Sequence, residues 1–395
     1  MAIAAKIVDF MERSSWIRKM FEEGAALKAQ YGADQVCDFT LGNPDVPAPP
    51  AVEEELKKII EEPIPMKYGY MPNAGSPATR QAVAEYLAGE QQVAVTADSI
   101  IMTCGAGGAL NVIFKAILNP GDEIIAPSPY FVEYNFYADN HGGVLKSVPP
   151  GENFALNLEA IAAAINARTA AVIINSPNNP SGVIFGAAEI AALGRLLEDK
   201  SRELGRVIYL ISDEPYRKIV YDGVEVPPIF PAYRNSIVAN SYSKELSLAG
   251  ERIGYLALHP EADDFRQLVD GFIFANRVLG FVNAPGLMQR LVARLQGACV
   301  DVAIYQRKRD RLYEGLKAAG FEVVKPQGAF YFFPKSPLPD DVEFVRELQK
   351  FKILAVPGSG FAGPGYFRLA YCVDDATIER SLPIFKEVGE KFCRV

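Results

Sequence analysis

Between about residues 90 and 260, short apolar runs alternate with stretches of helical pattern. Each run is rich in β-branched residues and apolar at successive positions, which is typical of strands buried on both faces. The runs are SIIMT, DEIIAP, AAVIINSP, RVIYLISDEP, SIVANSYS and RIGYLALHP. Because helical crossovers separate them, they predict an α/β fold with a mainly parallel sheet sandwiched by helices.

Small and polar residues follow the ends of several of these runs. Gly105, Asn175, Asp213 and Ser241 each stand at or just beyond the carboxyl end of a predicted strand. Ligands of open parallel sheets bind outside the carboxyl ends of the strands. We therefore expect these residues to converge on one site.

The two ends of the chain follow a different pattern. They predict a helix over 7–30, an extended connector over 41–50, a long charged helix after about 286, strands over 321–334 and 366–373, and a last helix from Asp375. We expect a large domain over residues 46–288. A smaller α+β domain would combine residues 1–45 with residues 289–395.

Composition narrows the class of protein. With 395 residues, the chain is long enough for two or three domains, and 49% hydrophobic against 22% charged residues is typical of a soluble globular protein. A net charge of −8, without a basic run, argues against nucleic acid as a partner. The N-terminal 20 residues are interrupted by charges, so they predict neither a signal peptide nor a membrane span. We expect a cytoplasmic protein with no membrane contact.

Cysteine and histidine usage restricts the chemistry further. Five scattered cysteines favour a reducing compartment over a disulfide framework. His141 and His259 are the two histidines, and neither has a second metal ligand nearby in sequence. No metal site and no Ser/His/Asp triad is therefore predicted. Catalysis must depend on Lys, Asp, Tyr and Arg.

The segment SYSKELSLAGERIGY, residues 241–255, places a lysine beside a potential anion site. Uncharged neighbours can desolvate Lys244, which favours the neutral amine that attacks carbonyl groups. Ser241, Ser243 and Arg252 could hold a phosphate. An aldehyde that carries a phosphate is pyridoxal phosphate. A lone lysine is more commonly a solvated surface residue, so other partners of this cofactor must be found.

A second anion site is predicted in TCGAGGALNVIFKAI, residues 103–117, which follows a strand and opens a helix. Gly105 makes the turn, and the backbone N–H groups of Ala106 and Gly107 would face an anion at the helix N-terminus. Many such glycine-rich segments are only tight turns. The segment lacks the GKS or GKT ending of a nucleotide-binding loop and the complete GxGxxG fingerprint.

Further candidates stand beyond two predicted strands. Asp213 could keep a pyridine nitrogen protonated, and Tyr216 and Asn179 could bind the phenolic oxygen of the same ring. As alternatives, Asp213 could cap a helix and Asn179 could form a turn. Phe131 could stack on the ring, although an isolated aromatic residue is more often core. Arg368 alternates with apolar residues on a strand, where it could bind a carboxylate or form a structural salt bridge.

In this order, the motifs resemble those of the fold-type I pyridoxal-phosphate enzymes, specifically the class I/II aminotransferases related to aspartate aminotransferase. The resemblance implies that Lys244 forms the internal aldimine and that Ser241 and Arg252 bind phosphate. It also implies that Asp213 binds the ring nitrogen and that Arg368 binds the substrate carboxylate. Asn179 and Tyr216 match the ligands of the phenolic oxygen, Phe131 the stacking residue, and Ala106 and Gly107 the phosphate-loop amides.

Two further matches concern the substrate and the assembly. Gly42 in LGNPDV matches the glycine that lines the substrate site, beside the expected substrate contacts Asn179 and Arg368. Tyr70 in YMPNAG matches the tyrosine that reaches phosphate from the neighbouring subunit, which implies a homodimer with shared active sites. For a second substrate carboxylate the chain offers Arg277, which is more typical of a surface or interface residue.

The predicted reaction is transamination between an L-amino acid and a 2-oxo acid, with Lys244 moving the α-proton and Asp213 and Tyr216 assisting. A C–S β-lyase or an aminocyclopropane-carboxylate synthase would use the same cofactor contacts, and a sensor that kept the fold without catalysis is a third possibility. The resemblance also implies cis peptide bonds before Pro129 and Pro180.

Overall fold

A computed structural model describes residues 3–13 and 15–393 of the chain. Within this part, one sheet has seven strands in the order β2-β8-β7-β6-β5-β3-β4. The strands are β2 (Ile100–Thr103), β3 (Glu123–Pro127), β4 (Val144–Val148), β5 (Thr169–Asn175), β6 (Tyr209–Asp213), β7 (Ser236–Ser241) and β8 (Gly254–Leu258). Strands β4, β3, β5, β6 and β7 are parallel, whereas β8 is antiparallel to β7 and β2. The mainly parallel α/β sheet is confirmed, and all six expected strands are present.

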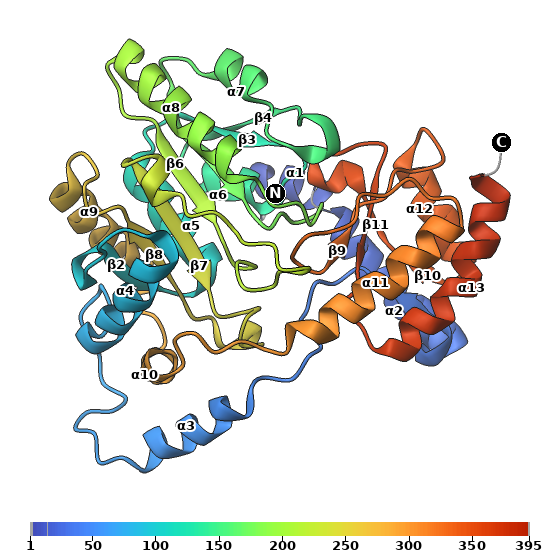
Figure 1. Ribbon diagram of the computed structural model, residues 1–395, viewed down its shortest axis with the longest axis horizontal. Helices are drawn as coiled ribbons and strands as arrows, with labels where there is room; N and C mark the ends of the chain where they lie inside the picture. The colour runs from blue at the N-terminus through green and yellow to red at the C-terminus, as the bar shows by residue number, and fades with distance from the viewer. Residues whose placement is uncertain (1–2, 14, 394–395) are drawn as a thin grey trace.

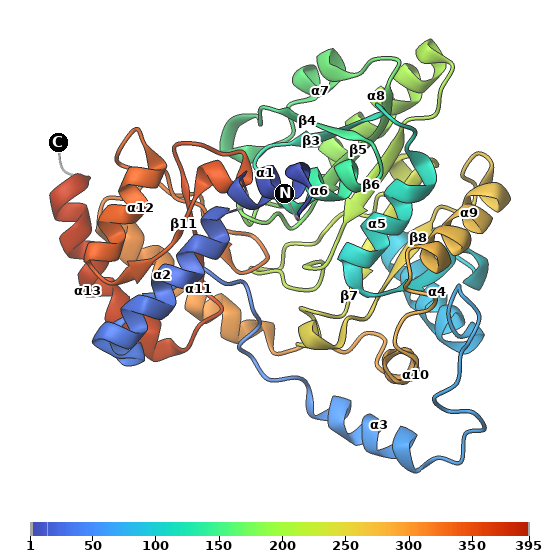
Figure 2. The same ribbon diagram turned by 180° about the vertical axis from the view of Figure 1, so that it is seen from behind.

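Helices cover the sheet and form much of the rest of the molecule (Figures 1 and 2). They are α1 (Ala5–Arg13), α2 (Ser15–Tyr31), α3 (Pro50–Glu61), α4 (Pro77–Gln91), α5 (Gly105–Ile117), α6 (Glu133–Asn140), α7 (Leu158–Ala164), α8 (Ala187–Leu204), α9 (Phe265–Val278), α10 (Gly286–Arg294), α11 (Val302–Ala318), α12 (Asp341–Lys350) and α13 (Asp375–Phe392). Figure 1 shows α7 and α8 in front of the sheet, and Figure 2 shows α5 and α6 on the opposite side.

The strand sequences explain why both faces of the sheet are covered. Successive side chains of a strand point to opposite faces. Ile125 and Val172 pack with side chains of α4, α8 and α10 in one core. Their neighbours Ile124 and Ile173 pack with side chains of α5, α6 and α9 in another. Because the central strands carry apolar side chains on both faces, both faces require a helical layer.

Strand β4 was not predicted from the sequence. It lies at the edge of the sheet and pairs with β3 alone. Val144, Ser147 and Lys146 of β4 are exposed or half-buried, so this strand lacks the continuous apolar run of the central strands. An edge strand that is largely exposed has a composition close to that of a loop.

Helix α2, strand β1 (Cys37–Asp38) and the C-terminal elements lie together in a second group, at the right of Figure 1, whereas α1 packs Phe10 against Phe136 of α6. Strands β11 (Val356–Pro357), β12 (Phe367–Ala370) and β9 (Tyr331–Phe332) form an antiparallel sheet, and β1 pairs in parallel with β10 (Ile353–Leu354). The expected strands were longer than β9 and β12. Gly328 and Ala329 precede β9, and Ala329 has a left-handed φ of 57°, so the extended run cannot begin earlier.

The terminal helices agree with the sequence predictions except where a break divides them. The helix expected over 7–30 corresponds to α1 and α2, and residue 14 between them lies outside the described residues. The long helix expected after 286 is divided into α10 and α11, with Gly297 at a φ of 84° between them. The last helix begins at Asp375 as expected. The bonds Ser128–Pro129 and Asn179–Pro180 are cis, which confirms both predictions, and Ser176–Pro177 is a third cis bond.

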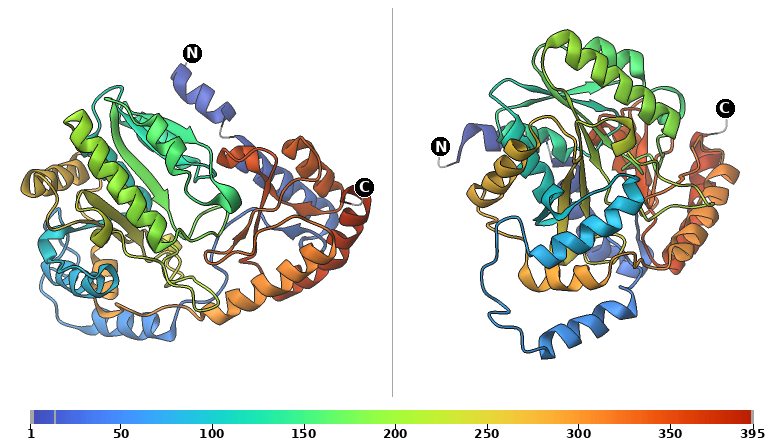
Figure 3. Two further views of the ribbon diagram at one scale, coloured as in Figure 1. Left: turned by 45° about the horizontal axis from the view of Figure 1, so that its top comes forward. Right: turned by 60° about the vertical axis from the view of Figure 1, so that its left-hand side comes forward.

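Helix α3 lies at the edge of the molecule and packs Val52 and Ile59 into the same core as Leu291 of α10, and the segment from α3 to α4 forms an extended loop (Figure 3). This loop carries three strongly exposed apolar side chains, Met66 at 82%, Tyr68 at 75% and Tyr70 at 91% exposure. Side chains of this size rarely stand this far from a core without a binding partner. In the described residues, no helix is long and apolar enough to span a bilayer.

Candidate active site

A cavity of about 350 Å³ lies where the strand ends of the large sheet approach the second group of elements. It unites most of the predicted site residues, which come from segments far apart in the sequence. Those that line it are Gly42, Ala106, Gly107, Phe131, Asn179, Asp213, Tyr216, Ser241, Ser243, Lys244, Arg252 and Arg368. Gly105 lies directly behind the wall beside Arg252. Tyr70 does not line the cavity of its own chain.

The register of the parallel strands brings the strand-end residues together. Asn175 of β5 stands opposite Asp213 of β6. The Asn175 side chain donates to the Asp213 backbone oxygen at 2.8 Å and accepts from the Asn179 backbone N–H at 2.6 Å. Ser241 closes β7 on the other side of β6. The expected convergence of these residues is therefore confirmed.

Lys244 lies at the centre of the chemistry. Its Nζ donates to the Gly42 backbone oxygen at 2.9 Å, and the amine is half-buried in the cavity wall. Burial lowers the pKa of Lys244 to about 8, with the charges of Arg368 and Arg252 acting in the same direction. A substantial fraction of this amine is neutral near pH 8, which suits a lysine that attacks an aldehyde.

Asp213 is a buried carboxylate with one oxygen unpaired. Its Oδ2 accepts from the Tyr134 hydroxyl at 2.5 Å, whereas its Oδ1 has no hydrogen-bond partner in the described residues. Burial raises the pKa of Asp213 to about 7, because few groups compensate the negative charge. A cationic ring nitrogen at Oδ1 would supply that compensation, so the carboxylate fits pyridoxal phosphate.

Arg368 is held by neutral groups. Its Nη2 donates to the Thr40 backbone oxygen at 2.6 Å and its Nη1 donates to Asn179 Oδ1 at 3.1 Å. Its Nε is buried and has no partner in the described residues, and no aspartate or glutamate is among the groups that shift its pKa. Arg368 is therefore neither exposed nor part of a structural salt bridge, and both of these alternatives are wrong. A buried guanidinium without a counter-ion is suited to a substrate carboxylate.

The opposite side of the cavity fits a phosphate. Gly105 has a φ of 73°, and a Cβ there would lie 2.8 Å from Nη2 of Arg252. Ala106 and Gly107 occupy the first turn of α5, where backbone N–H groups lack helical partners. Arg252 donates through Nη1 to the Ala249 backbone oxygen at 3.0 Å. The glycine thus permits the guanidinium and the helix N-terminus to approach the same anion.

The remaining predicted residues line the middle of the cavity. The Tyr216 hydroxyl lies 2.7 Å from the Tyr331 hydroxyl, and burial raises the pKa of Tyr216 well above its usual value. A Cβ on Gly42 would overlap the Tyr331 hydroxyl, so only glycine fits there. Phe131 contacts Tyr134 edge to face at 5.7 Å between ring centroids.

Sequence reasoning missed Tyr331, Glu133 and Tyr137, which line this wall, and Tyr134, which donates to Asp213 from outside the lining. Tyr134 follows Phe131 by three residues, which was a weak signal that its ring could approach the same site. Tyr331 lies in the apolar run GAFYFF and looks like an ordinary core residue in sequence. Its role depends on pairing with Tyr216, which is 115 residues away.

Arg277 is exposed on α9 and packs its guanidinium over the Phe274 ring at 5.3 Å. It does not belong to the cavity wall. The expectation that it is a surface or interface residue agrees with this position.

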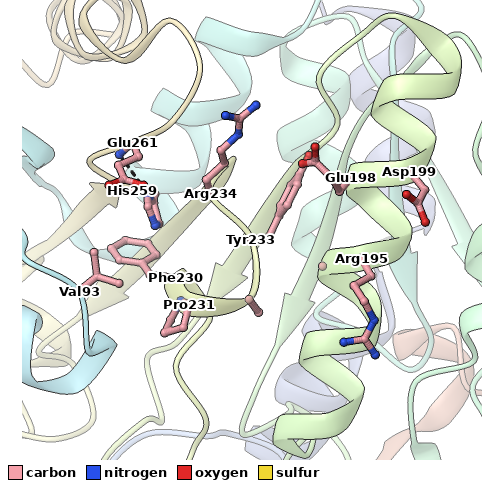
Figure 4. Close-up of a pocket in the computed structure, with 12 residues that line it drawn as sticks. Val93, Arg195, Glu198, Asp199, Phe230, Pro231, Tyr233, Arg234, His259 and Glu261 are labelled. Carbon is pink, nitrogen blue, oxygen red and sulfur yellow. Dashed lines mark hydrogen bonds between the residues drawn. The ribbon is translucent and has the colours of Figure 1, made fainter.

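The two histidines lie away from the cavity. His141 contacts Asn111, and His259 packs against Phe230. In the described residues no group of three or more His, Cys, Asp or Glu side chains could hold a metal ion. A hollow of about 740 Å³ beside α8 is shown in Figure 4, where His259 accepts from the Glu261 backbone and Arg195 and Arg234 point in different directions. None of the predicted site residues lines this hollow.

Comparisons with known proteins agree with this geometry. Residues 34–383 match the family model described as aminotransferase class I and II. The chain is 35% identical to a "Probable aspartate aminotransferase" of Methanocaldococcus jannaschii, over 89% of this chain and 92% of that protein. It is 34% identical to the "Aspartate/prephenate aminotransferase" of Thermus thermophilus, over 90% and 91% of the two chains.

Solved structures are similar over almost the whole chain. An amino transferase from Eubacterium rectale superposes with a TM-score of 0.96 at 40% identity, covering 100% of both chains. The aspartate aminotransferase of Thermus thermophilus, solved with maleate, gives a TM-score of 0.84 at 30% identity over 95% of this chain and 96% of that one.

Proposed function

This chain belongs to the class I and II aminotransferase family, whose members depend on pyridoxal phosphate and move an amino group from an L-amino acid to a 2-oxo acid. From this premise we propose a role for each predicted residue of the cavity. The observation that carries these roles is that Asp213 and Arg368, each with a buried polar atom that has no hydrogen-bond partner, line the same cavity as Lys244. The names of the relatives do not favour the lyase alternative.

Residues of this chain would hold the aldehyde, the ring and the phosphate of the cofactor. Lys244 would bind its aldehyde carbon, and Asp213 would pair with its ring nitrogen. The backbone of Ala106 and Gly107 would bind the phosphate. The phosphate side is completed by Gly105, Ser241, Ser243 and Arg252, and the ring by Phe131, Asn179 and Tyr216. When bound, the cofactor supplies an electron sink that stabilises negative charge on the substrate Cα.

The chain's own residues would then align the substrate and move its proton. Arg368 would bind the α-carboxylate bidentately, with Asn179 holding the guanidinium at 3.1 Å and Gly42 leaving room beside it. Lys244, freed as an amine, would take the proton from the substrate Cα and would donate it to the cofactor carbon that carried the aldehyde. An amine whose pKa is about 8 can both accept and release a proton near neutral pH.

A half-reaction screen tests this function. Purified protein loaded with pyridoxal phosphate would be mixed with single L-amino acids, and conversion of the bound cofactor to its amine form would be followed by absorbance. Release of a 2-oxo acid in step with this conversion is expected. Ammonia and pyruvate formed from cystathionine without a 2-oxo acid acceptor would instead indicate a lyase.

Replacing Arg368 by alanine is expected to raise KM for every amino acid substrate. Lost charged hydrogen bonds are worth about 1.5–3 kcal/mol, which corresponds to an increase of roughly 10- to 150-fold. Steady-state kinetics would measure it, with Arg202→Ala as the matched control because Arg202 is an exposed arginine on α8 outside the cavity. An unchanged KM in Arg368→Ala would remove Arg368 from carboxylate binding.

We also propose that two copies of the chain form a dimer in which Tyr70 completes the partner's phosphate site. The exposed residues Met66, Tyr68 and Tyr70 would belong to the interface. Asn276 donates to the Asn73 backbone oxygen at 2.9 Å, which joins this loop to α9 and its exposed Phe274. Exposed apolar side chains on both of these segments support burial against a second copy.

Mixing two defective variants, Lys244→Ala and Tyr70→Ala, tests the shared site. A hybrid dimer would contain one site with native Lys244 and native Tyr70. Random mixing is therefore expected to restore activity at limiting cofactor to about a quarter of the wild-type value, because half the dimers are hybrids and each has one intact site. No recovery after subunit exchange, with hybrids demonstrated by mass spectrometry, would refute the shared arrangement.

Two broader expectations remain proposals. We propose that residues 46–288 form a large cofactor-binding domain, with residues 1–45 and 289–395 forming the small domain. A separate apolar core that contains Phe321, Phe344 and Phe385 supports a second domain, whereas Leu291 and Val292 of α10 pack in the core of the large sheet. A cytoplasmic location is supported by five cysteines that are all free thiols in the structure.

A further inference from the structure

Glu133 is an acidic side chain in the cavity wall that none of the roles above explains. It is the first residue of α6, two positions after Phe131, and lines the cavity with Tyr137 and Gly107. The Tyr137 hydroxyl would lie 3.0 Å from a Cβ on Gly107. Glu133 therefore belongs to the wall beside the first turn of α5, while Arg368 is held by Asn179 and Thr40.

The Glu133 carboxylate is half-buried and has no hydrogen-bond or salt-bridge partner in the described residues. Burial raises the pKa of Glu133, and no neighbouring charge adds to or offsets this effect. A carboxylate removed from water without a donor costs free energy. A bound group that brings a positive charge or N–H donors would recover it.

Each cation that lines the cavity already has a proposed binding partner. Lys244, Arg252 and Arg368 are the positively charged residues that line it in the part of the chain described. Their proposed tasks are the cofactor aldehyde, the phosphate and the α-carboxylate. An amino acid with a second carboxylate would meet Glu133 without a cation to offset the repulsion.

We propose that Glu133 receives the positively charged side chain of the amino donor, so that the enzyme favours basic L-amino acids, of the lysine, ornithine and arginine class, over aspartate and glutamate. This inference rests on the proposed binding of the α-carboxylate by Arg368. An ammonium or guanidinium group would donate charge-assisted hydrogen bonds to the carboxylate, whereas a distal carboxylate would be rejected by its like charge.

A helix N-terminus also favours an acidic residue, so this structural role must be separated from substrate recognition. Glu159 provides the matched case. It lies in the first turn of the short helix α7, is exposed, and is not part of the cavity wall. Glu159→Gln removes the same charge from the first turn of another helix without altering the cavity.

The experiment measures binding of three acids that lack an α-amino group: 5-aminopentanoate, pentanoate and glutarate. The protein is loaded with the amine form of the cofactor, which has no aldehyde with which the amine of 5-aminopentanoate could condense. Calorimetric titration of the loaded wild type is expected to show 5-aminopentanoate binding about 10-fold or more tightly than pentanoate. Glu133→Gln is expected to remove this preference and to tighten glutarate severalfold. Glu159→Gln should keep the wild-type pattern. The kcat/KM ratio of L-ornithine to L-norleucine is expected to fall about 10- to 100-fold in Glu133→Gln alone.

Three results would overturn the inference: a wild type that prefers glutarate to 5-aminopentanoate, ratios that Glu133→Gln leaves unchanged, or weaker glutarate binding in Glu133→Gln. The last would mean that Glu133 positions a cation. If neutral amino acids react but the enzyme shows no preference between basic and acidic amino acids, only this inference fails. If no amino acid of any charge converts the cofactor, the proposed roles of the site fail with it.

Discussion

Replacement of Lys244 by alanine is expected to lower kcat by at least about 10⁴-fold, because the same amine both binds the cofactor and carries the substrate proton. The cavity offers no substitute in the described residues: Arg252 and Arg368 are its other cations, and a guanidinium stays protonated. Single-turnover absorbance with a reactive amino acid would measure the rate of the proton transfer.

Lys244→Arg separates charge from chemistry in this prediction. It keeps a cation in the cavity but cannot act as a base or attack an aldehyde, so the loss should match that of Lys244→Ala. Borohydride treatment of the loaded wild type should fix the cofactor to the peptide containing Lys244, as detected by mass spectrometry. More than about 1% of wild-type activity in either variant would contradict the assignment of both steps to this amine.

Much of the site could be predicted because its residues stand at strand ends. Asp213 and Ser241 follow continuous apolar runs, and parallel strands that are hydrogen-bonded in register end at one edge. The position of each residue along the chain therefore determines its position in space. The same argument placed Gly105 and the phosphate loop at the start of α5.

The parts that escaped prediction depend on contacts between distant segments. Tyr331 gains its role from the Tyr216 hydroxyl, and Thr40 gains its role from Arg368, 328 residues away. Neither segment carries a polar pattern that distinguishes it from core or connector. Arg368 illustrates the same limit, because a strand arginine is equally compatible with a salt bridge until its surroundings are seen to lack a carboxylate.

Replacing Asp213 by asparagine is expected to lower kcat by about 10²–10³-fold, because an amide cannot hold a positive charge on the ring nitrogen as a carboxylate does. The amide oxygen can still accept from the Tyr134 hydroxyl, so the loss would reflect charge rather than packing. Half-reaction rates measure the effect. Asp270→Asn, an exposed aspartate outside the cavity, is the matched control.

Although Asp213→Asn should lower kcat, it should raise the free energy of unfolding of the cofactor-free protein at pH 8. Burial raises the pKa of Asp213 from 3.8 to about 7, so between these values the folded state binds more protons than the unfolded state. The free energy of unfolding therefore falls as pH rises through this window, by up to roughly 4 kcal/mol from this group. Asparagine has no charge to bury, so cofactor-free Asp213→Asn should exceed the wild type in stability at pH 8 and approach it near pH 4. Urea unfolding at both pH values measures the difference.

Addition of the cofactor tests the pairing between Asp213 and the ring nitrogen. Because a cationic ring nitrogen would offset the charge of the carboxylate, pyridoxal phosphate should stabilise the wild type more than Asp213→Asn. An equal gain in the free energy of unfolding for both proteins would refute this pairing.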